Sequence, residues 1–407
     1  MGHEMTSQVA ISNFYGVAVA SDTVSSRQTG GGLKTVTHTN KIYELGPGHE
    51  VLVLHSGSSV TNGVPAWLLV TQWAKTLRGP LETVQDYIDS FLRWADEASP
   101  LHSKDSENEI LGWRINSHLS QIAQSTRSAI GKLQDQNPDT SESIDSRAVL
   151  ATTLRSNMDW LKSQPTLENL TSENAAELFA NYPKKKLDDM VQYWLSQFNV
   201  DKKDNALIKE SITYALSSAF YLSDDDSSLA FVGFGSTQAF PFNRVLQCRA
   251  FYSGKLRYVL KEPRDYAPKE SLDSGIDFFA QSYAIEGFLR GYRNQTLNQI
   301  GNYIDQALVN EVTPPVDEAI RDKVVAQVLD KARDFAQNTY VEPLFGEVQG
   351  MNASRLAEFA ESLVGLQAIA AKGEDGPATV GGLIEVATID KGTGIRWVKC
   401  LDQRKIQ

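Results

Sequence analysis

Apolar residues alternate with small or polar residues at the start of the chain. The alternation covers 9–11 and 17–19, with a turn signal at Asn13-Phe14-Tyr15-Gly16 between the two segments. A period of two residues is typical of a half-buried strand, so this pattern predicts a strand pair. A second strand pair is predicted over 41–45 and 51–54.

After Val64 the alternation gives way to apolar residues at intervals of three and four. This spacing predicts two helices, over 67–77 and 81–92, separated by Gly79-Pro80. The polar segment from Ser25 to Gly32 ends in three glycines, and we predict a loop there.

The stretch from about residue 101 to residue 227 has a different character. Strand patterning nearly vanishes, polar residues increase, and apolar residues in its second half follow helical spacing. We predict an all-helical insertion that is interrupted near its prolines, Pro138, Pro165 and Pro183. The chain therefore divides into residues 1–100, the insertion 101–227, and residues 228–407.

Strand patterns return after the insertion, and Ser253-Gly254 is a hairpin signal between two of these strands. Runs of strands and runs of helices follow one another, which indicates an α+β fold with antiparallel sheets and helices on their outer faces. The predicted strands are 229–234, 245–252, 256–260, 383–389 and 395–400, and the predicted helices are 274–292, 316–340 and 352–371.

Composition narrows the class of protein. Lys and Arg number 39 against 50 Asp and Glu, a net charge of −11. This balance argues against nucleic acid or an anionic membrane as partner and favours a cytoplasmic protein. No apolar run is long enough to span a membrane, and the two cysteines are expected to be reduced. The six histidines are dispersed without ligand spacing, so we expect no metal and no cofactor.

Four residues at predicted strand ends could carry chemistry. Thr6 begins the first strand, Asp22 ends the second, Lys41 begins the third, and Gly57 follows the fourth. In an antiparallel arrangement the start of strand one lies beside the end of strand two, and the start of strand three can join them. A hydroxyl, a carboxylate, an ammonium group and a backbone N–H could then converge.

Each of these residues also has a purely structural interpretation. Thr6 is β-branched and favours a strand for that reason alone. Asp22 could be a turn carboxylate, Lys41 an exposed strand lysine, and Gly57 a simple bend. Their joint order along the chain favours the functional interpretation over the four separate ones.

The residues at these positions resemble those of the proteasome family of N-terminal nucleophile hydrolases. The chain looks like a bacterial-type homologue of this family with a helical insertion. The run from Gly16 to Thr23 matches the family's strand that ends in an Asp, and Asp22 is the seventeenth residue counted from Thr6. Asn40-Lys41-Ile42 and Gly57 match in order, and Gly381-Gly382 opens a strand like the family's double-glycine strand. The resemblance covers about 6–100 and 228–400.

Membership implies a four-layer αββα sandwich and a threonine-type peptidase or amidase that acts on a peptide or protein substrate. Thr6 would be the nucleophile and its own α-amine the base, while Lys41, held by Asp22, favours the ionised hydroxyl. The Gly57 N–H would donate to the oxyanion. Asp375, Thr379 and Ser282 are the nearest matches to the family's supporting Asp and Ser residues.

That mechanism requires Thr6 to be the first residue of the active chain. Cleavage between Met5 and Thr6 would expose it, as would a translation start at Met5 followed by methionine removal. The alternative is a catalytically inactive scaffold, a kind of subunit that the resemblance also implies. The insertion either binds a partner protein or only enlarges the fold or shields the site. Family members form rings, so a homo-oligomer or ring is a further expectation.

Overall fold

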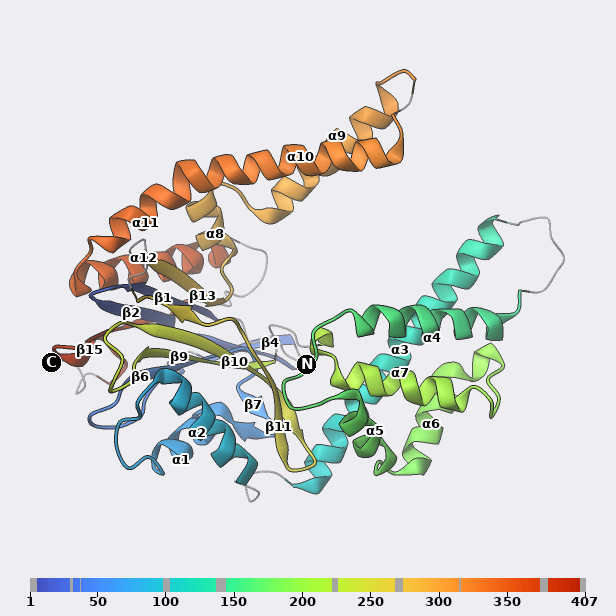
Figure 1. The fold of residues 1–407 in the computed structure, drawn as a ribbon, viewed down its shortest axis with the longest axis horizontal. Coiled ribbons are helices and arrows are strands. Elements are labelled where there is room, and N and C mark those ends of the chain that lie inside the picture. Colours follow the sequence, from blue (N-terminus) through green and yellow to red (C-terminus); the bar gives the residue numbers. More distant parts are fainter. Residues whose placement is uncertain are drawn as a thin grey trace.

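Two antiparallel sheets occupy the middle of the left-hand part of the molecule in Figure 1. The computed structural model describes residues 6–29, 32–36, 38–97, 103–136, 144–221, 226–267, 274–314, 316–373 and 380–402. The first sheet has the order β13-β1-β2-β14-β15. Its strands are β1 (Ser7–Asn13), β2 (Gly16–Asp22), β13 (Gly275–Ala280), β14 (Ile384–Asp390) and β15 (Gly394–Lys399).

The second sheet has the order β11-β10-β9-β6-β5, with β12 paired to β10. Ser253 and Gly254 both have positive φ between β10 and β11, as a tight hairpin turn requires. The strands are β5 (Ile42–Glu44), β6 (Glu50–Ser56), β9 (Ser227–Phe234), β10 (Phe242–Tyr252), β11 (Lys255–Leu260) and β12 (Arg264–Asp265). Two short pairs lie off both sheets: β3 (Ser25–Thr29) with β4 (Gly32–Val36), and β7 (Val60–Thr61) with β8 (Val64–Pro65).

The sheets pack on each other through one apolar core and on helices through two more. Val17 and Val19 of the first sheet pack with Leu52 and Leu54 of the second. Alternate side chains of each strand point outward, so each sheet also buries its outer face. The second sheet packs on α1 (Ala66–Ala74) and α2 (Val84–Glu97), and the first on α8 (Tyr283–Arg290), α11 (Glu342–Gln349) and α12 (Ala353–Lys372). The expected mixture of helices and antiparallel strands is confirmed.

Residues from 111 to 216 form a separate apolar cluster, to the right in Figure 1. The helices are α3 (Lys104–Gln136), α4 (Ser146–Lys162), α5 (Ser172–Ala180), α6 (Lys184–Leu195) and α7 (Asn205–Ser217), with single 3₁₀ turns at Ser196–Phe198 and Ala219–Tyr221. This cluster meets the second sheet at the β10–β11 hairpin, where the Asn169 amide donates to Leu256 O at 2.8 Å.

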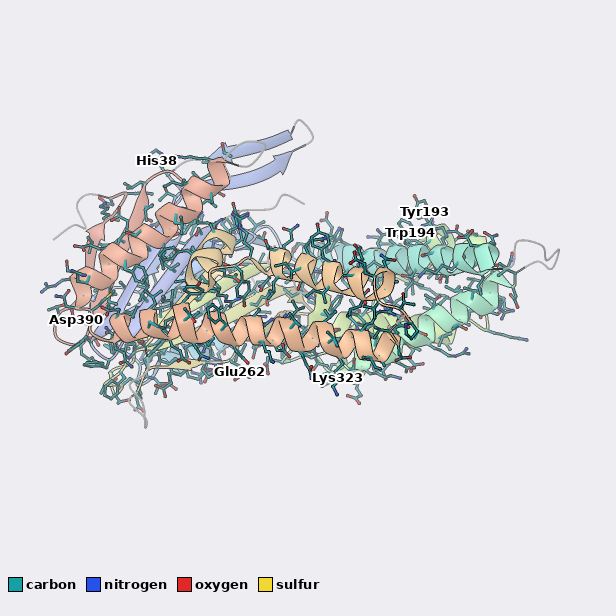
Figure 2. The ribbon with its side chains drawn as sticks, turned by 90° about the horizontal axis from the view of Figure 1, so that it is seen from above. His38, Tyr193, Trp194, Glu262, Lys323 and Asp390 are labelled. Carbon is teal, nitrogen blue, oxygen red and sulfur yellow. The ribbon has the colours of Figure 1, made fainter. Side chains whose placement is uncertain are left out.

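A second helical projection follows α8. In Figure 1 the helices α9 (Asn294–Asn310) and α10 (Glu318–Ala336) form an arm away from the sheets, and a π-helical segment, Gln337–Val341, joins α10 to α11. Figure 2 shows the arm from above, with Lys323 on α10. Among the described ranges, none of the helices combines the length and apolar character needed to cross a membrane.

Two expectations from the pattern are wrong, and one helix was missed. The segment predicted as a loop after Ser25 pairs as β3 and β4, which project near His38 in Figure 2. These strands belong to neither sheet, and the sequence of β3 contains no apolar residue from which a period of two could be recognised. The helix predicted over 274–292 begins as strand β13, a six-residue segment interrupted by Asp277 that is too short to be told from a helix by its apolar period. The helix α9 was not predicted.

Candidate active site

Hydrogen bonds between strands bring Thr6, Asp22 and Lys41 to the same end of the two sheets. The ladder that pairs Ser7 with Ala280 continues one residue further, because Gln281 N–H donates to Thr6 O at 2.8 Å. In the neighbouring pair, Gln8 lies opposite Ser21, so the end of β2 lies beside the start of β1. His55 N–H donates to Lys41 O at 2.9 Å, which aligns Lys41 with the end of β6.

The carboxylate of Asp22 accepts four donors and is fully buried. Its Oδ1 accepts from the backbone N–H of Ser7 at 3.0 Å and from Lys41 Nζ at 2.8 Å. Its Oδ2 accepts from the N–H groups of Val24 at 3.2 Å and Gly381 at 3.1 Å. A buried charge is tolerated when it is paired and its lone pairs are satisfied, which is the case here.

Lys41 is 3% exposed, so it is not an exposed strand lysine. Its ammonium donates to Asp22 and also to the backbone oxygen of Val24. Since Ser7 N–H and the ammonium share one carboxylate oxygen, Asp22 fixes Lys41 beside the peptide that joins Thr6 to Ser7. The sequence-predicted trio is therefore brought together, with Asp22 at its centre.

The side chain of Thr6 faces the space between the sheet ends. In an extended segment residues two apart share a face, so Thr6 points to the same side as Gln8. The Gln8 amide crosses to the second sheet and donates to His55 O at 2.8 Å. Thr6 is 3% exposed, so its hydroxyl lies in a nearly closed space.

Gly57 lies in a turn directly after β6. Its φ is +75°, a left-handed conformation that favours glycine. Among the residues that the structure describes, its N–H has no hydrogen-bond acceptor. His55 Nε2 lies 2.8 Å from Ser58 O and closes this turn. Burial, with a smaller contribution from the positive charge of Lys41, lowers the pKa of His55 to about 4, so the ring is neutral near pH 7.

The predicted supporting residues have different outcomes. Ser282 follows Gln281 and so lies near the start of β1, but its hydroxyl donates to Glu286 Oε1 at 2.6 Å. Glu286 in turn pairs with Arg290 at 3.2 Å. Asp375 and Thr379 lie outside the described residues.

Several neighbours of the site were not anticipated from the sequence. Gln8 and His55 carried no motif, since one is an isolated amide and the other one of six dispersed histidines. Gly381 was noticed only as part of a double glycine, and its contact with Asp22 was not foreseen. Gly382 has φ +76°, and a Cβ there would lie 2.7 Å from Thr23 Oγ1. The double glycine thus lets this segment approach β2 closely.

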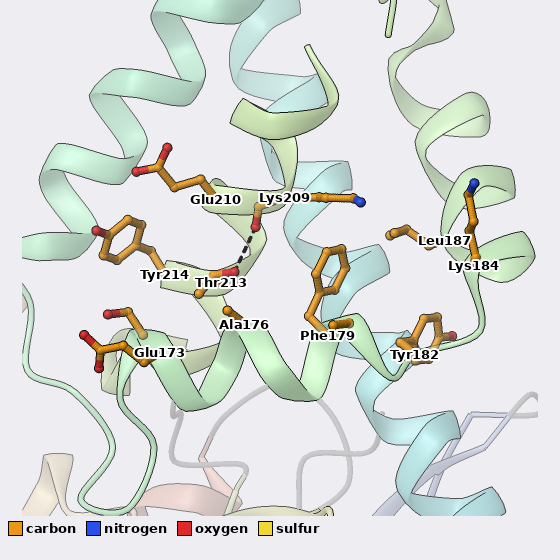
Figure 3. Close-up of a pocket in the computed structure, with 12 residues that line it drawn as sticks. Glu173, Ala176, Phe179, Tyr182, Lys184, Leu187, Lys209, Glu210, Thr213 and Tyr214 are labelled. Carbon is orange, nitrogen blue, oxygen red and sulfur yellow. Dashed lines mark hydrogen bonds between the residues drawn. The ribbon is translucent and has the colours of Figure 1, made fainter. Parts of the chain in front are cut away.

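A surface pocket of about 590 Å³ lies elsewhere, between α5, α6 and α7. Figure 3 shows Phe179 and Leu187 within it, Glu173 and Glu210 towards one side, and Lys184 towards the other.

Comparison of the sequence with models of protein families and with curated proteins finds no match. Among the described residues, no three His, Cys, Asp or Glu side chains gather as metal ligands would. The geometry at Asp22 is therefore the feature of this chain that bears on its function.

Proposed function

We propose that the chain is a threonine-type peptidase or amidase of the proteasome type, with Thr6 as the N-terminal nucleophile. Two facing antiparallel sheets with helices on both outer faces support a four-layer αββα core. The observation that carries the proposal is the buried Asp22 carboxylate, which binds both Lys41 and the N–H of the residue after Thr6. The positive charge of Lys41, held near Thr6 by Asp22, would stabilise the ionised form of the Thr6 hydroxyl.

The reaction begins when the Thr6 hydroxyl attacks the substrate carbonyl and passes its proton to the free α-amine of Thr6. The Gly57 N–H donates to the oxyanion of the tetrahedral intermediate, and one such donor is worth about 3–4 kcal/mol. The C–N bond then breaks, and the leaving amine takes up the proton. Water hydrolyses the remaining ester between the acyl group and Thr6. Ser282, Asp375 and Thr379 are proposed only as supporting residues.

Mass spectrometry of the N-terminus tests the first requirement. Chains that begin at Thr6 in cell-purified protein are expected, through cleavage after Met5 or a start at Met5. A peptide vinyl sulfone should label this form on Thr6, and Thr6→Ala should abolish the labelling. Retention of Met1 on every molecule, or labelling that persists in Thr6→Ala, contradicts the proposal.

The second candidate function is an inactive scaffold whose insertion binds a partner protein. The apolar pocket between α5, α6 and α7 favours it, since exposed apolar surface with a charged rim is typical of interaction sites. Lys209→Glu would change the pocket rim without touching Thr6. Loss of a co-purifying protein with unchanged vinyl sulfone labelling would separate this role from catalysis. Light scattering would test the expected homo-oligomer or ring, and the cytoplasmic location stays a prediction.

A further inference from the structure

Gln8 forms a hydrogen bond between the two sheets close to Thr6. It lies two residues after Thr6 on β1, and its amide donates to His55 O on β6 at 2.8 Å and to Ser21 Oγ at 3.1 Å. Gln8 and Ser21 are fully buried. Because water does not compete with a buried bond, this contact fixes the spacing between β1 and the end of β6.

His55 holds the turn that contains Gly57. Its backbone N–H donates to Lys41 O, and its ring nitrogen Nε2 lies 2.8 Å from Ser58 O. The ring is neutral near pH 7 because burial lowers its pKa to about 4, so the tautomer with a proton on Nε2 donates to the carbonyl. The ring thus spans Ser56 and Gly57 and closes the turn across them.

We infer that Gln8 and His55 are positioning residues that set the direction and distance of the Gly57 N–H relative to Thr6. Gln8 fixes His55 against the strand of the nucleophile, and the His55 ring fixes the turn in the conformation that gives Gly57 its positive φ. The inference rests on the proposed function, since an oxyanion donor needs a nucleophile. Oxyanion stabilisation depends on a donor that is already in place before the reaction.

The test compares His55→Leu, which keeps the bulk and removes the donor, with His55→Gln, whose amide can still reach Ser58 O. With a fluorogenic peptide amide we expect kcat to fall about 100-fold in His55→Leu with KM changed less than about 3-fold, as for loss of an oxyanion donor. His55→Gln should recover kcat to within about 10-fold of wild type. Gln8→Met should lower kcat less, and it serves as the second variant if His55→Leu does not fold.

A peptide vinyl sulfone separates this inference from the proposed function. It reacts with the Thr6 hydroxyl by conjugate addition, so no carbonyl oxyanion forms next to the attacked atom, and labelling should continue in His55→Leu. His49→Leu is the matched control, because His49 bonds Tyr87 at the other end of β6, and kcat should not change. If the vinyl sulfone does not label the wild type, both the proposed function and this inference are overturned. If the wild type is labelled but kcat in both His55→Leu and Gln8→Met equals the wild-type value, this inference alone is overturned.

Discussion

Charged side chains are buried at the sheet ends but exposed to solvent around the pocket of the helical insertion. At the sheet ends, Asp22 and Lys41 are buried, and the carboxylate has four donors. On the insertion, Lys184 and Lys209 border an open pocket and are exposed to solvent. The first region therefore depends on a complete set of partners, whereas the rim of this pocket tolerates changes of charge.

The largest effect is expected from Lys41→Met, which leaves the buried Asp22 carboxylate without its cation. Breaking a buried pair in this way costs about 3–5 kcal/mol of unfolding free energy, measured by urea denaturation. Lys162→Met is the matched control, since Lys162 lies 3.8 Å from Asp159 on the surface, and it should cost less than about 1 kcal/mol. Equal losses in the two variants would remove the contrast between the regions.

Leu154→Ala tests whether the insertion is stabilised by its own core. Leu154 is buried in the cluster formed by the insertion helices, and removal of its side chain should cost about 2–5 kcal/mol. The loss should appear in the unfolding transition reported by Trp160 and should be smaller in the transition reported by Trp73, which packs in the core. A matched change, Leu52→Ala between the sheets, should destabilise the transition reported by Trp73 more than the one reported by Trp160. Identical shifts of the two transitions in each variant would show that the regions unfold together.

Two buried histidines with strongly lowered pKa values, His55 at the sheet ends and His118 in the insertion, dominate the pH dependence of stability. Burial also lowers the pKa of His49 at the other end of β6. Burial lowers the pKa of His55 and of His118 to about 4, so the unfolded chain binds protons that the folded chain does not. Stability is therefore full above about pH 6.5 and falls as the pH decreases toward 4. Between pH 7 and 5 the loss should be about 2 kcal/mol per histidine.

His118→Gln separates the two contributions. His118 Nε2 lies 2.8 Å from Ser211 Oγ, a contact that an amide can retain. The variant should lose about half of the pH dependence measured by urea denaturation at pH 7 and pH 5. If the pH dependence of the unfolding free energy does not change, groups other than His118 cause it.

The smallest effect is expected where the two regions meet. Gly254 has φ +71° in the β10–β11 turn, and nothing lies within 4 Å of a Cβ built there. Gly254→Ala should therefore cost only the conformational strain, about 1 kcal/mol. Thermal unfolding would measure it. The control is Gly131→Ala near the C-terminal end of α3, where space is also open, and it should be neutral or stabilising. A larger loss at Gly254 would mean that the hairpin supports the insertion more strongly than its local contacts indicate.

Strands with a buried face could be predicted from the sequence, because an apolar period of two records burial directly. β1 and β2 follow this pattern, and β6 contains a short continuous apolar run, Val51–Leu54. The order of these strands was sufficient to group Thr6, Asp22 and Lys41 at one end. β3 and β4 could not be predicted, because their pairing is polar on both faces. The acidic run in the sequence that ends at Asp226 is typical of a solvated turn, but Asp226 forms a largely buried ion pair with Arg114 at 2.7 Å.

The finer geometry of the candidate site could not be predicted because it depends on contacts between distant segments. Gly381 donates to Asp22 across 359 positions of sequence, and Gln8 reaches His55 across 47. No local pattern encodes a partner at such a distance. His55 illustrates the limit: its residue type was visible, but its contact with Ser58 depends on a turn conformation that only the folded chain defines.

The ion pair between Asp22 and Lys41 has a topological consequence. These residues lie at the two ends of the segment that contains β3 and β4, 19 positions apart, so their bond closes this segment into a ring much as a crosslink would. The entropy of loop closure grows only slowly with length, about 0.6 kcal/mol per doubling. Chain could therefore be added between β3 and β4 through evolution or engineering while Asp22 and Lys41 stay in register.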